Sequence, residues 1–390
     1  MHIIFFTHPD FLNHQSMPRF TRMLARGMKE RGHKIEIWAP KPTAFNLPFP
    51  ASLKKWLGYV DQYVFFPMEV RGRLKKIKQK TLFVFTDQAL GPWIPLVRDR
   101  PHIIHCHDFL AQFSAVKQNS ENPTGWSGKQ YQKMIYRGYT KGKNFISVSR
   151  KTKRDLHYFL PANPEISKVV YNGLNRDFSP GEAQMMRQFL QEYFRLELSS
   201  GYILHVGGNQ WYKNRSGVIE IYNSWRHKYN QSIPLLLIGQ SPDKNLEQKH
   251  VDSPYKNDIH FLTKVPDEVV KTAYSGATVF LFPSLAEGFG WPIAEAMASG
   301  CPVITTDEAP MTEVAGEAGF LISRQPKNSV NIENWANDSA EVLNTVINLT
   351  QQKREEYIGK GIVNARRFDQ DKALDEIERI YGMVLSKTKN

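Results

Sequence analysis

The sequence predicts an α/β protein that holds two doubly wound parallel sheets of similar size. Strand-sized apolar runs alternate with stretches of helical periodicity along the whole chain. This rhythm stops in a mostly polar segment at residues 179–201 and then starts again. The length of 390 residues agrees with two or three domains, because one ordinary domain holds about 100–200 residues.

The first half begins with an apolar run at residues 2–6. A helix should follow from Ser16, a candidate N-cap, to Gly32, a candidate C-cap, since apolar residues recur between them at helical spacing. Further strands are expected at 35–39, 82–85, 103–106, 145–148 and 169–171. Such a β-α-β succession is typical of parallel sheets.

The second half begins with a polar helix predicted at residues 182–198. Strands are then expected at 202–206, 235–238, 260–262, 279–282 and 303–305. A closing helix at 370–386 has apolar residues at helical spacing, and we expect it to return to the first domain. The predicted domains are 1–185 and 186–368, with 369–390 as the returning segment.

Composition excludes several classes of protein. Hydrophobic residues make up 41% and charged residues 23%, as in globular chains, and no apolar run approaches the roughly 18 residues of a membrane-spanning helix. Two cysteines, Cys106 and Cys301, rule out a disulfide framework and a cysteine zinc site. No basic region precedes the short apolar run at 3–6, so we expect no signal peptide and a cytoplasmic location.

The positive charge of the chain is concentrated in its first half. Residues 1–180 hold 29 Lys and Arg against 12 Asp and Glu, whereas residues 181–390 hold 22 against 26. The first half therefore faces something anionic, and a nucleic acid, an anionic membrane surface and a phosphorylated acceptor all remain open.

Two basic stretches, 52–57 and 71–80, lie in this half. They are either a solvated helix face or a patch at a membrane interface. The apolar anchors of such a patch would be Trp56, Tyr63, Phe65 and Phe66.

The most informative segment is 282–306, in which an apolar strand, a glycine-bearing turn and a helix follow one another. Turn amides beside a helix N-terminus form a ready anion site. Gly288 and Gly290 allow the backbone to approach a ligand closely. Two carboxylates, Glu287 and Glu295, bracket this turn, and a carboxylate beside a phosphate site is well suited to bind sugar hydroxyls. A purely structural strand-turn-helix remains the alternative.

Glu287 and Glu295, separated by seven residues, resemble the E-x7-E signature of the retaining GT-B glycosyltransferases of family four. Segments 169–180, 203–214 and 311–322 resemble the inter-domain segment, the first C-domain strand with its phosphate loop, and a later turn and strand of that family. The resemblance implies two Rossmann-like domains that face each other across a cleft, and transfer of a sugar from a nucleotide diphosphate.

The resemblance also implies roles for single residues. Glu295 would hold the ribose hydroxyls, and Glu287 would contact hydroxyls of the transferred sugar near the reacting carbon. The amides of Gly288, Phe289 and Gly290 would bind sugar hydroxyls and diphosphate. Lys213 would neutralise the departing diphosphate.

The sequence departs from the family pattern in two loops. Gly207, Gly208 and Asn209 occupy the place of the usual arginine, so Lys213 would act with Arg215 or with a cation of the first domain. Gly208 and Asn209 are still expected in the nucleotide-sugar site. The usual N-terminal glycine pair is replaced by the loop 13–16, in which His14 is a candidate acceptor contact.

A second polar cluster, residues 105–108, follows a strand of the first half, where α/β proteins bind ligands. His105 and His107 are two apart and share a strand face. His107, as a further catalytic candidate, and Asp108 are expected to contact acceptor hydroxyls, although a buried structural histidine is the common alternative. Trp126 stands in a polar and aromatic loop, 119–143, that we expect near the acceptor.

We expect neither a metal nor a cofactor. The histidine cluster lacks a third ligand. The D-x-D-like triplet at 369–371 resembles the metal motif of another glycosyltransferase fold, but it precedes a helix, so an Asp cap is the simpler explanation.

The sequence thus predicts a retaining hexosyltransferase that uses a nucleotide diphosphate sugar, UDP-linked first and GDP-mannose second. Its acceptor would be a glycan or a lipid-linked molecule, and it would lie in the cytoplasm or peripherally on the inner face of the cytoplasmic membrane. A nucleotide-sugar epimerase or hydrolase of the same fold remains open. A basic nucleic-acid-binding protein is a further alternative, although no nucleic-acid motif occurs and no such partner is expected.

Overall fold

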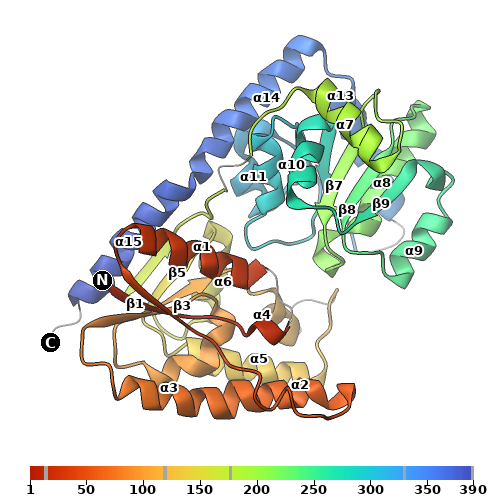
Figure 1. Ribbon diagram of the computed structural model, residues 1–390. Coiled ribbons are helices and arrows are strands. Elements are labelled where there is room, and N and C mark those ends of the chain that lie inside the picture. Colours follow the sequence, from red (N-terminus) through yellow and green to blue (C-terminus); the bar gives the residue numbers. More distant parts are fainter. Residues whose placement is uncertain (13–15, 117–120, 175–177, 328–330, 388–390) are drawn as a thin grey trace. The chain divides into compact units, whose positions relative to one another are not determined.

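The computed structural model describes residues 1–12, 16–116, 121–174, 178–327 and 331–387. They form two compact units, Met1–Tyr171 with Asp371–Asn390, and Asn172–Gln370 (Figure 1). The boundary after Tyr171 falls earlier than the expected residue 185. The helix α7 (Ala183–Phe194) belongs to the second unit, in which the Arg187 side chain donates a 2.8 Å hydrogen bond to the carbonyl of Gly276.

The first unit contains a six-stranded parallel sheet of order β2-β1-β3-β4-β5-β6. The strands are β1 (His2–Phe6), β2 (Lys34–Trp38), β3 (Thr81–Phe85), β4 (His102–Cys106), β5 (Asn144–Ser147) and β6 (Ile166–Val169). Every residue of β1, β3, β4 and β5 is buried, because helices cover both faces of the sheet. This explains why these strands appear in the sequence as apolar runs.

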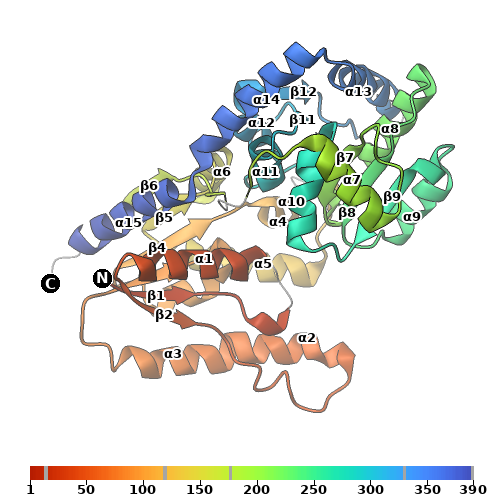
Figure 2. The same cartoon turned by 45° about the horizontal axis from the view of Figure 1, so that its top comes forward.

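The helical segments of this unit are α1 (Ser16–Glu30), α2 (Ala51–Val60), α3 (Phe66–Leu74), α4 (Leu110–Ala115), α5 (Trp126–Tyr139), α6 (Arg150–Phe159), α15 (Gln370–Lys387), the 3₁₀ turns η1 (Asp10–Leu12) and η3 (Gln88–Leu96), and the π-helical turn η2 (Asp61–Phe65). Figures 1 and 2 show α2, η2 and α3 as one continuous rod along one side of the unit. The closing helix α15 packs against α1, where Arg31 pairs with Asp375 at 2.6 Å.

The second unit contains another six-stranded parallel sheet, of order β12-β11-β10-β7-β8-β9. The strands are β7 (Ile203–Gly207), β8 (Leu235–Gly239), β9 (Ile259–Thr263), β10 (Val279–Phe282), β11 (Val303–Thr306) and β12 (Gly319–Ile322). Besides α7, its helical segments are α8 (Arg215–Tyr229), α9 (Lys244–Val251), α10 (Asp267–Gly276), α11 (Trp291–Ala298), α12 (Met311–Ala315), α13 (Ile332–Ile347), α14 (Gln351–Ala365), η4 (Trp211–Lys213), η5 (Lys256–Asp258), η6 (Gly316–Ala318) and η8 (Arg366–Phe368). The predicted fold class of two doubly wound domains is confirmed.

Three predicted elements need correction. The strand expected at 169–171 lies earlier, at β6, and the polar helix expected at 182–198 ends at Phe194. The segment 119–143, predicted as a loop, contains the helix α5, because Ile135 and Tyr139 bury one face of it. The polar residues of the segment concealed this helix, since its exposed side is mostly polar.

The helix α5 approaches the 3₁₀ turn η3 so closely that both partners must be glycine. A Cβ atom on Gly138 would lie 2.0 Å from the carbonyl oxygen of Gly91, and one on Gly91 would lie 2.3 Å from the carbonyl oxygen of Ile135. Both obstacles are backbone atoms, so a side-chain rotation cannot relieve the clash. This contact fixes α5, which carries several of the cavity residues described below.

We predict that Gly138→Ala destabilises the first unit by about 1–3 kcal/mol or more, because the added methyl forces the two backbones apart. The free energy of unfolding from urea titrations measures the effect. Gly382→Ala in α15 is the control: nothing lies within 4 Å of its added methyl, and alanine favours helix. Equal stabilities of the two variants would contradict the close contact.

Candidate active site

In an open parallel sheet, ligands bind outside the carboxyl ends of the strands, where the strand order reverses direction. In the second unit this switch point lies between β7 and β10, which are neighbours in the sheet although two strands separate them in sequence. The glycine-bearing turn predicted as the donor site directly follows β10, and Lys213 lies in η4 after β7. The sheet therefore brings together two segments that are about 70 residues apart.

Lys213 and Glu287 meet at this switch point. The Lys213 Nζ lies 2.8 Å from Glu287 Oε1, and the two side chains are only 15% and 8% exposed. Ser284 Oγ lies 2.7 Å from the same carboxylate oxygen and 2.7 Å from the carbonyl of Tyr212, and its single proton can serve one of them at a time. Lys213 and Glu287 thus form a largely buried ion pair that is surrounded by polar groups of Ser284 and Tyr212.

Backbone and side-chain hydrogen bonds hold the loop after β10 against the loop after β7. The amide of Leu285 donates to the carbonyl of Tyr212 at 2.7 Å, and Asn214 Nδ2 donates to the carbonyl of Pro283 at 2.9 Å. Asn214 has a φ of 53° and its side chain also caps α8. The position of Lys213 opposite Glu287 is therefore fixed by its neighbours.

The helix α11 begins directly after this loop. Its N-cap is Gly290, whose φ of +102° is a conformation that other residues rarely adopt and which offers no side chain to the first amides of the helix. Phe289 is buried and its ring contacts that of Phe368 at 5.3 Å between centroids. Only the backbone of Phe289 is thus suited to a ligand, which agrees with the predicted role of its amide.

Glu295 lies in the first turns of α11 and is half-buried. Its Oε2 accepts a 3.1 Å hydrogen bond from the hydroxyl of Tyr274. Burial, together with the charge of Glu295 and this hydrogen bond, raises the pKa of Tyr274 well above its ordinary value, so the phenol stays a donor. Tyr274 thereby sets the orientation of the Glu295 carboxylate.

Arg215 fills the space between the ends of β7 and β8. It is 4% exposed, and its guanidinium donates to Asn209 Oδ1 and, at 2.8 Å, to the carbonyl of Gln240. Burial lowers the pKa of Arg215 to about 10. Two further nitrogens of this guanidinium have no hydrogen-bond partner among the described residues. Asn209 is held here too, since its amide lies 3.1 Å from Gln240 Oε1, and Gly208 precedes it in the same turn.

The first unit holds a second polar site at the ends of β3 and β4. His8 Nε2 lies 2.8 Å from Asp87 Oδ2, and the backbone amide of Ala89 donates to Asp87 Oδ1 at 3.0 Å. Burial alone would raise the pKa of Asp87. Three neighbours lower this pKa by more than burial raises it, so the pKa lies below its ordinary value; they are His8, through its hydrogen bond and charge, His107, and the amide of Ala89. Asp87 is therefore an ionised carboxylate in a buried position.

His107 belongs to the same site. Its Nε2 donates a 2.9 Å hydrogen bond to the carbonyl of Thr86, since a carbonyl only accepts, and this leaves Nδ1 as the acceptor nitrogen. Burial lowers the pKa of His107 more than Asp87 and Thr86 raise it, so the ring is neutral at pH 7. His105 shares this face, as predicted, and both rings contact Phe20.

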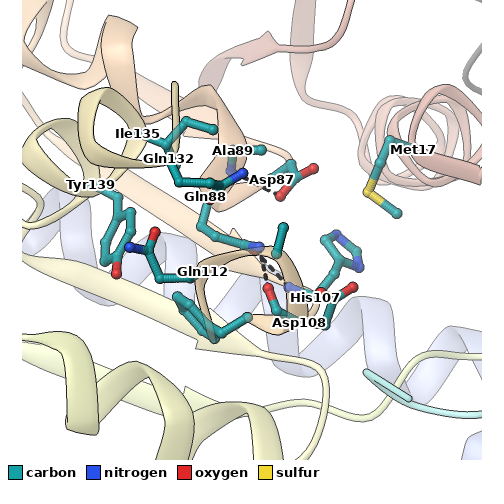
Figure 3. Close-up of a pocket in the computed structure, with 12 residues that line it drawn as sticks. Met17, Asp87, Gln88, Ala89, His107, Asp108, Gln112, Gln132, Ile135 and Tyr139 are labelled. Carbon is teal, nitrogen blue, oxygen red and sulfur yellow. Dashed lines mark hydrogen bonds between the residues drawn. The ribbon is translucent and has the colours of Figure 1, made fainter. Parts of the chain in front are cut away.

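A cavity of about 220 Å³ lies beside these residues (Figure 3). Figure 3 shows Asp87, His107 and Met17 on one side of its lining and Gln112 with Tyr139 on the other. The described residues that line it are Met17, Asp87, Gln88, Ala89, His107, Asp108, Phe109, Ala111, Gln112, Gln132, Ile135 and Tyr139. They include two carboxylates and three glutamines but no lysine or arginine, a combination that suits an uncharged group rich in hydroxyls.

The sequence predicted His107 and Asp108 in this cavity but missed the residues contributed by η3, α4 and α5. Asp108 Oδ1 accepts from the amide of Leu110 at 3.0 Å, so the residue also stabilises the start of α4. Asp87 and Gln88 come just after an apolar strand, with Thr86 between, which is nearly the same signal that singled out His107. Gln112 and Tyr139 carried no such signal, because only the fold brings their helices to this place.

One of the predicted acceptor residues stands apart from the cavity, and another is not described by the structure. Trp126 begins α5, is 78% exposed and does not line the cavity. His14 lies outside the described residues. One of the apolar anchors predicted for the basic stretches is wrong, because Phe66 is 2% exposed within the core. Tyr63 is half-buried, and its hydroxyl donates to that of Tyr131 at 3.0 Å.

In the described part of the chain, no group of three or more His, Cys, Asp or Glu residues is arranged to hold a metal ion. Over the same residues, the structure contains no helix with the length and hydropathy that crossing a membrane requires.

Each half of the chain matches the model of a known protein family. A model described as Glycosyltransferase Family 4 matches residues 17–178, and one described as Glycosyl transferases group 1 matches residues 200–344. Together these ranges take in most of the chain; the first contains all strands of the first sheet except β1, and the second contains all strands of the second sheet.

Two curated relatives are mannosyltransferases. The O-antigen chain mannosyltransferase B of Escherichia coli is 27% identical over 258 residues, which is 65% of this chain and 64% of the relative. The O-antigen chain mannosyltransferase RfbU of Salmonella typhimurium is 28% identical over 189 residues, which is 48% of each chain. The aligned part thus spans between about half and two thirds of the length of these relatives.

Similar solved structures share the fold. HepE of Anabaena, solved with UDP and glucose, superposes with a TM-score of 0.71 at 16% identity and covers 98% of this chain and all of its own. WaaG, a glycosyltransferase involved in lipopolysaccharide biosynthesis, has a TM-score of 0.70 at 15% identity, over 97% of this chain and 99% of its own. With the two parallel sheets and the two matched family models, these findings show that the chain belongs to the GT-B glycosyltransferases.

Proposed function

We propose that the protein is a retaining hexosyltransferase of polysaccharide or glycoconjugate biosynthesis. The second unit binds a nucleotide diphosphate sugar, and the first unit binds a glycan or lipid-linked acceptor. UDP-hexose is the first candidate donor and GDP-mannose the second. The UDP bound by HepE supports the first candidate, and the names of the two curated relatives support mannose as the transferred sugar.

The observation that carries this proposal is the buried contact of Lys213 with Glu287 at the switch point of the second sheet. A cation, a carboxylate and the N-terminus of α11 occur together there. The cation and the helix terminus suit a diphosphate, whereas the carboxylate suits sugar hydroxyls. A nucleotide sugar presents both chemistries in adjacent groups.

Lys213 and the N-terminus of α11 would stabilise the negative charge that grows on the diphosphate as the glycosidic bond breaks. Glu287 would orient the sugar through its hydroxyls and so hold the anomeric carbon in place. In a front-face reaction the departing phosphate oxygen takes the proton of the acceptor hydroxyl, so no dedicated pair of carboxylates is needed. Gly208, Asn209, Gly288, Phe289 and Gly290 complete the proposed donor site.

Glu295 would bind the two ribose hydroxyls, because a carboxylate accepts two hydrogen bonds from a vicinal diol. The hydroxyl of Tyr274 holds the Glu295 carboxylate in position through its hydrogen bond to Oε2. On the acceptor side, Nδ1 of the neutral His107 ring is suited to accept a hydrogen bond from the reacting hydroxyl, and Asp108 lines the same cavity. Trp126 and His14 remain proposed acceptor contacts, and the reaction as proposed uses no metal or cofactor.

We also propose peripheral binding to an anionic membrane on its cytoplasmic face, through a surface on α2, η2 and α3. Its apolar side chains are Leu53, Trp56, Val64, Phe65 and Met68, each between 43% and 63% exposed. Together they present the apolar area that an interfacial helix buries between lipid headgroups.

The charges around this surface are almost all positive. Residues 51–80 contain eight Lys and Arg but only two carboxylates, Asp61 and Glu69. Asp61 is buried and accepts from the amides of Ala44 and Phe45 at 2.7 and 2.8 Å, while Glu69 pairs with Arg73. The remaining cations can each contribute about 1 kcal/mol near an anionic lipid surface.

We predict different effects for the two glutamates of the donor site. Glu295→Ala should weaken binding of the nucleotide sugar about 10- to 100-fold, because charge-assisted hydrogen bonds to the ribose are lost. Glu287→Ala should chiefly lower kcat, by about 100-fold or more. Calorimetric titration with UDP-glucose and GDP-mannose measures binding, and nucleotide release with glycan and lipid acceptors measures turnover.

The control for both is Glu317→Ala, since Glu317 is exposed in η6 and lies outside the proposed site. Full transfer activity of both glutamate variants would contradict the site. Nucleotide release that is equally fast with and without every acceptor would favour the hydrolase instead.

We predict that the protein co-sediments with vesicles of phosphatidylcholine and phosphatidylglycerol but not with phosphatidylcholine alone. The double variant Trp56→Ser/Met68→Ser should bind at least about tenfold more weakly, because two large apolar side chains no longer enter the interface. Val363→Ser, which removes an exposed apolar side chain of α14, is the control. Equal binding to both vesicle types would overturn the membrane proposal.

A further inference from the structure

A second and larger cavity lies in the first unit between α4, α5 and α6. It has a volume of about 690 Å³, within the range of small-molecule sites. The described residues that line it are Gln112, Ala115, Val116, Lys129, Gln130, Lys133, Tyr136, Arg137, Tyr158 and Phe159. Half of them are apolar or aromatic, three are cations and none is a carboxylate.

The three cations form a row on one helix. Lys129, Lys133 and Arg137 are spaced by four residues on α5, so they lie on one face and span about 12 Å along its axis. Among the described residues, none of the three has an ion pair with a carboxylate. A row of three cations of this length, without carboxylate partners, is suited to bind more than one phosphate group.

The aromatic side chains that line the cavity come from α5 and α6, and Phe113 of α4 packs against two of them. Phe159 is 8% exposed and contacts Phe113 at 4.8 Å between ring centroids, while Tyr158 is 61% exposed and stacks on the same ring. Tyr136 lies on α5 beside the cations. A ligand with an apolar body would therefore gain contact area directly next to its anionic group.

Gln112 joins this basic cavity to the cavity beside His107, because it lines both. It is 6% exposed, and its Oε1 has no hydrogen-bond partner among the described residues; the same holds for the hydroxyl of the buried Tyr139 in the His107 cavity. Buried polar atoms rarely lack a partner, so these two point to a polar ligand. The helix α5 contributes Gln132 to the His107 cavity and Lys133 to the basic one.

We infer that the basic cavity is the subsite for a phosphate or diphosphate group linked to a hydrocarbon chain, and that the His107 cavity, which has carboxylates and glutamines but no cation in its described lining, takes the sugar attached to it. The inference rests on the proposed function, since it assigns the acceptor of that transfer. It narrows this acceptor to a sugar carried on a lipid phosphate. Free glycans lack both the anion and the apolar body for which the basic cavity is built.

Calorimetric titration of the full chain tests this subsite with three probes: farnesyl diphosphate below its micellar concentration, inorganic diphosphate and farnesol. Farnesyl diphosphate should bind at least about tenfold more tightly than either of the others, because only it engages the cations and the aromatic side chains together. Equal affinity of inorganic diphosphate would show a plain anion site and overturn the inference. Equal affinity of farnesol would overturn it too.

Variants of the lining residues test whether farnesyl diphosphate binds in the basic cavity. Lys133→Gln/Arg137→Gln should weaken binding of farnesyl diphosphate at least about tenfold, since two charge-assisted contacts are lost. Tyr158→Ser, on an exposed side chain, should reduce the preference over inorganic diphosphate. Lys29→Gln, which removes one exposed lysine of α1 outside both cavities, is the control. Unchanged binding in the double variant would overturn the subsite.

Melting-temperature shifts with UDP and GDP, measured on the same variants, separate this inference from the proposed function. We expect the nucleotide response to be unchanged in the variants, because the basic cavity belongs to the other unit. A chain that binds farnesyl diphosphate through Lys133 and Arg137 but binds no nucleotide would support the subsite and contradict the proposed transfer.

Discussion

The ion pair of Lys213 and Glu287 is the interaction on which the donor site depends. The two charges lie 2.8 Å apart in largely buried positions, and neither would be stable there alone, because an unpaired buried charge costs about 3–5 kcal/mol. Each therefore holds the other in place before a substrate arrives. A diphosphate that approaches Lys213 supplies a new partner for the cation, and Glu287 is then available to sugar hydroxyls.

The direction of the strands explains why both polar sites lie where they do. Parallel strands end at the same sheet edge, so loops that are distant in sequence meet there and bring charged groups into contact. In the second unit this joins Lys213 to Glu287, and in the first it joins His8 to Asp87. In the first unit, the carboxylates line the cavity beside His107, whereas three cations of α5 line the cavity between α4, α5 and α6.

The sequence predicted what is encoded locally. Glu287, Gly290 and Glu295 lie within one strand-turn-helix, so their spacing was sufficient to identify the turn. Contacts between distant segments could not be predicted in this way. The partner of Glu295 is Tyr274, on another helix, and nothing in the sequence around either residue indicates the other.

The same limit applies to the helices of the first unit. The segment of α5 was predicted as a loop from its sequence. The face of α5 that is buried is determined by its contact with η3, which is distant in sequence. Phe66 was predicted at the surface but lies in the core, because an aromatic residue near a basic stretch does not reveal which face of a helix is buried. Trp56 and Phe65, predicted in the same way, are exposed.

The most direct test of this account is a thermal-shift screen of the purified protein with UDP, GDP, ADP and their common sugar conjugates. A ligand that binds only the folded state raises the melting temperature according to its affinity and concentration. We predict a clear increase with one base, UDP or GDP, and a further difference among the sugars carried by that base. A folded protein that shows no shift with any of these nucleotides would contradict the assignment of the second unit as a nucleotide-sugar site.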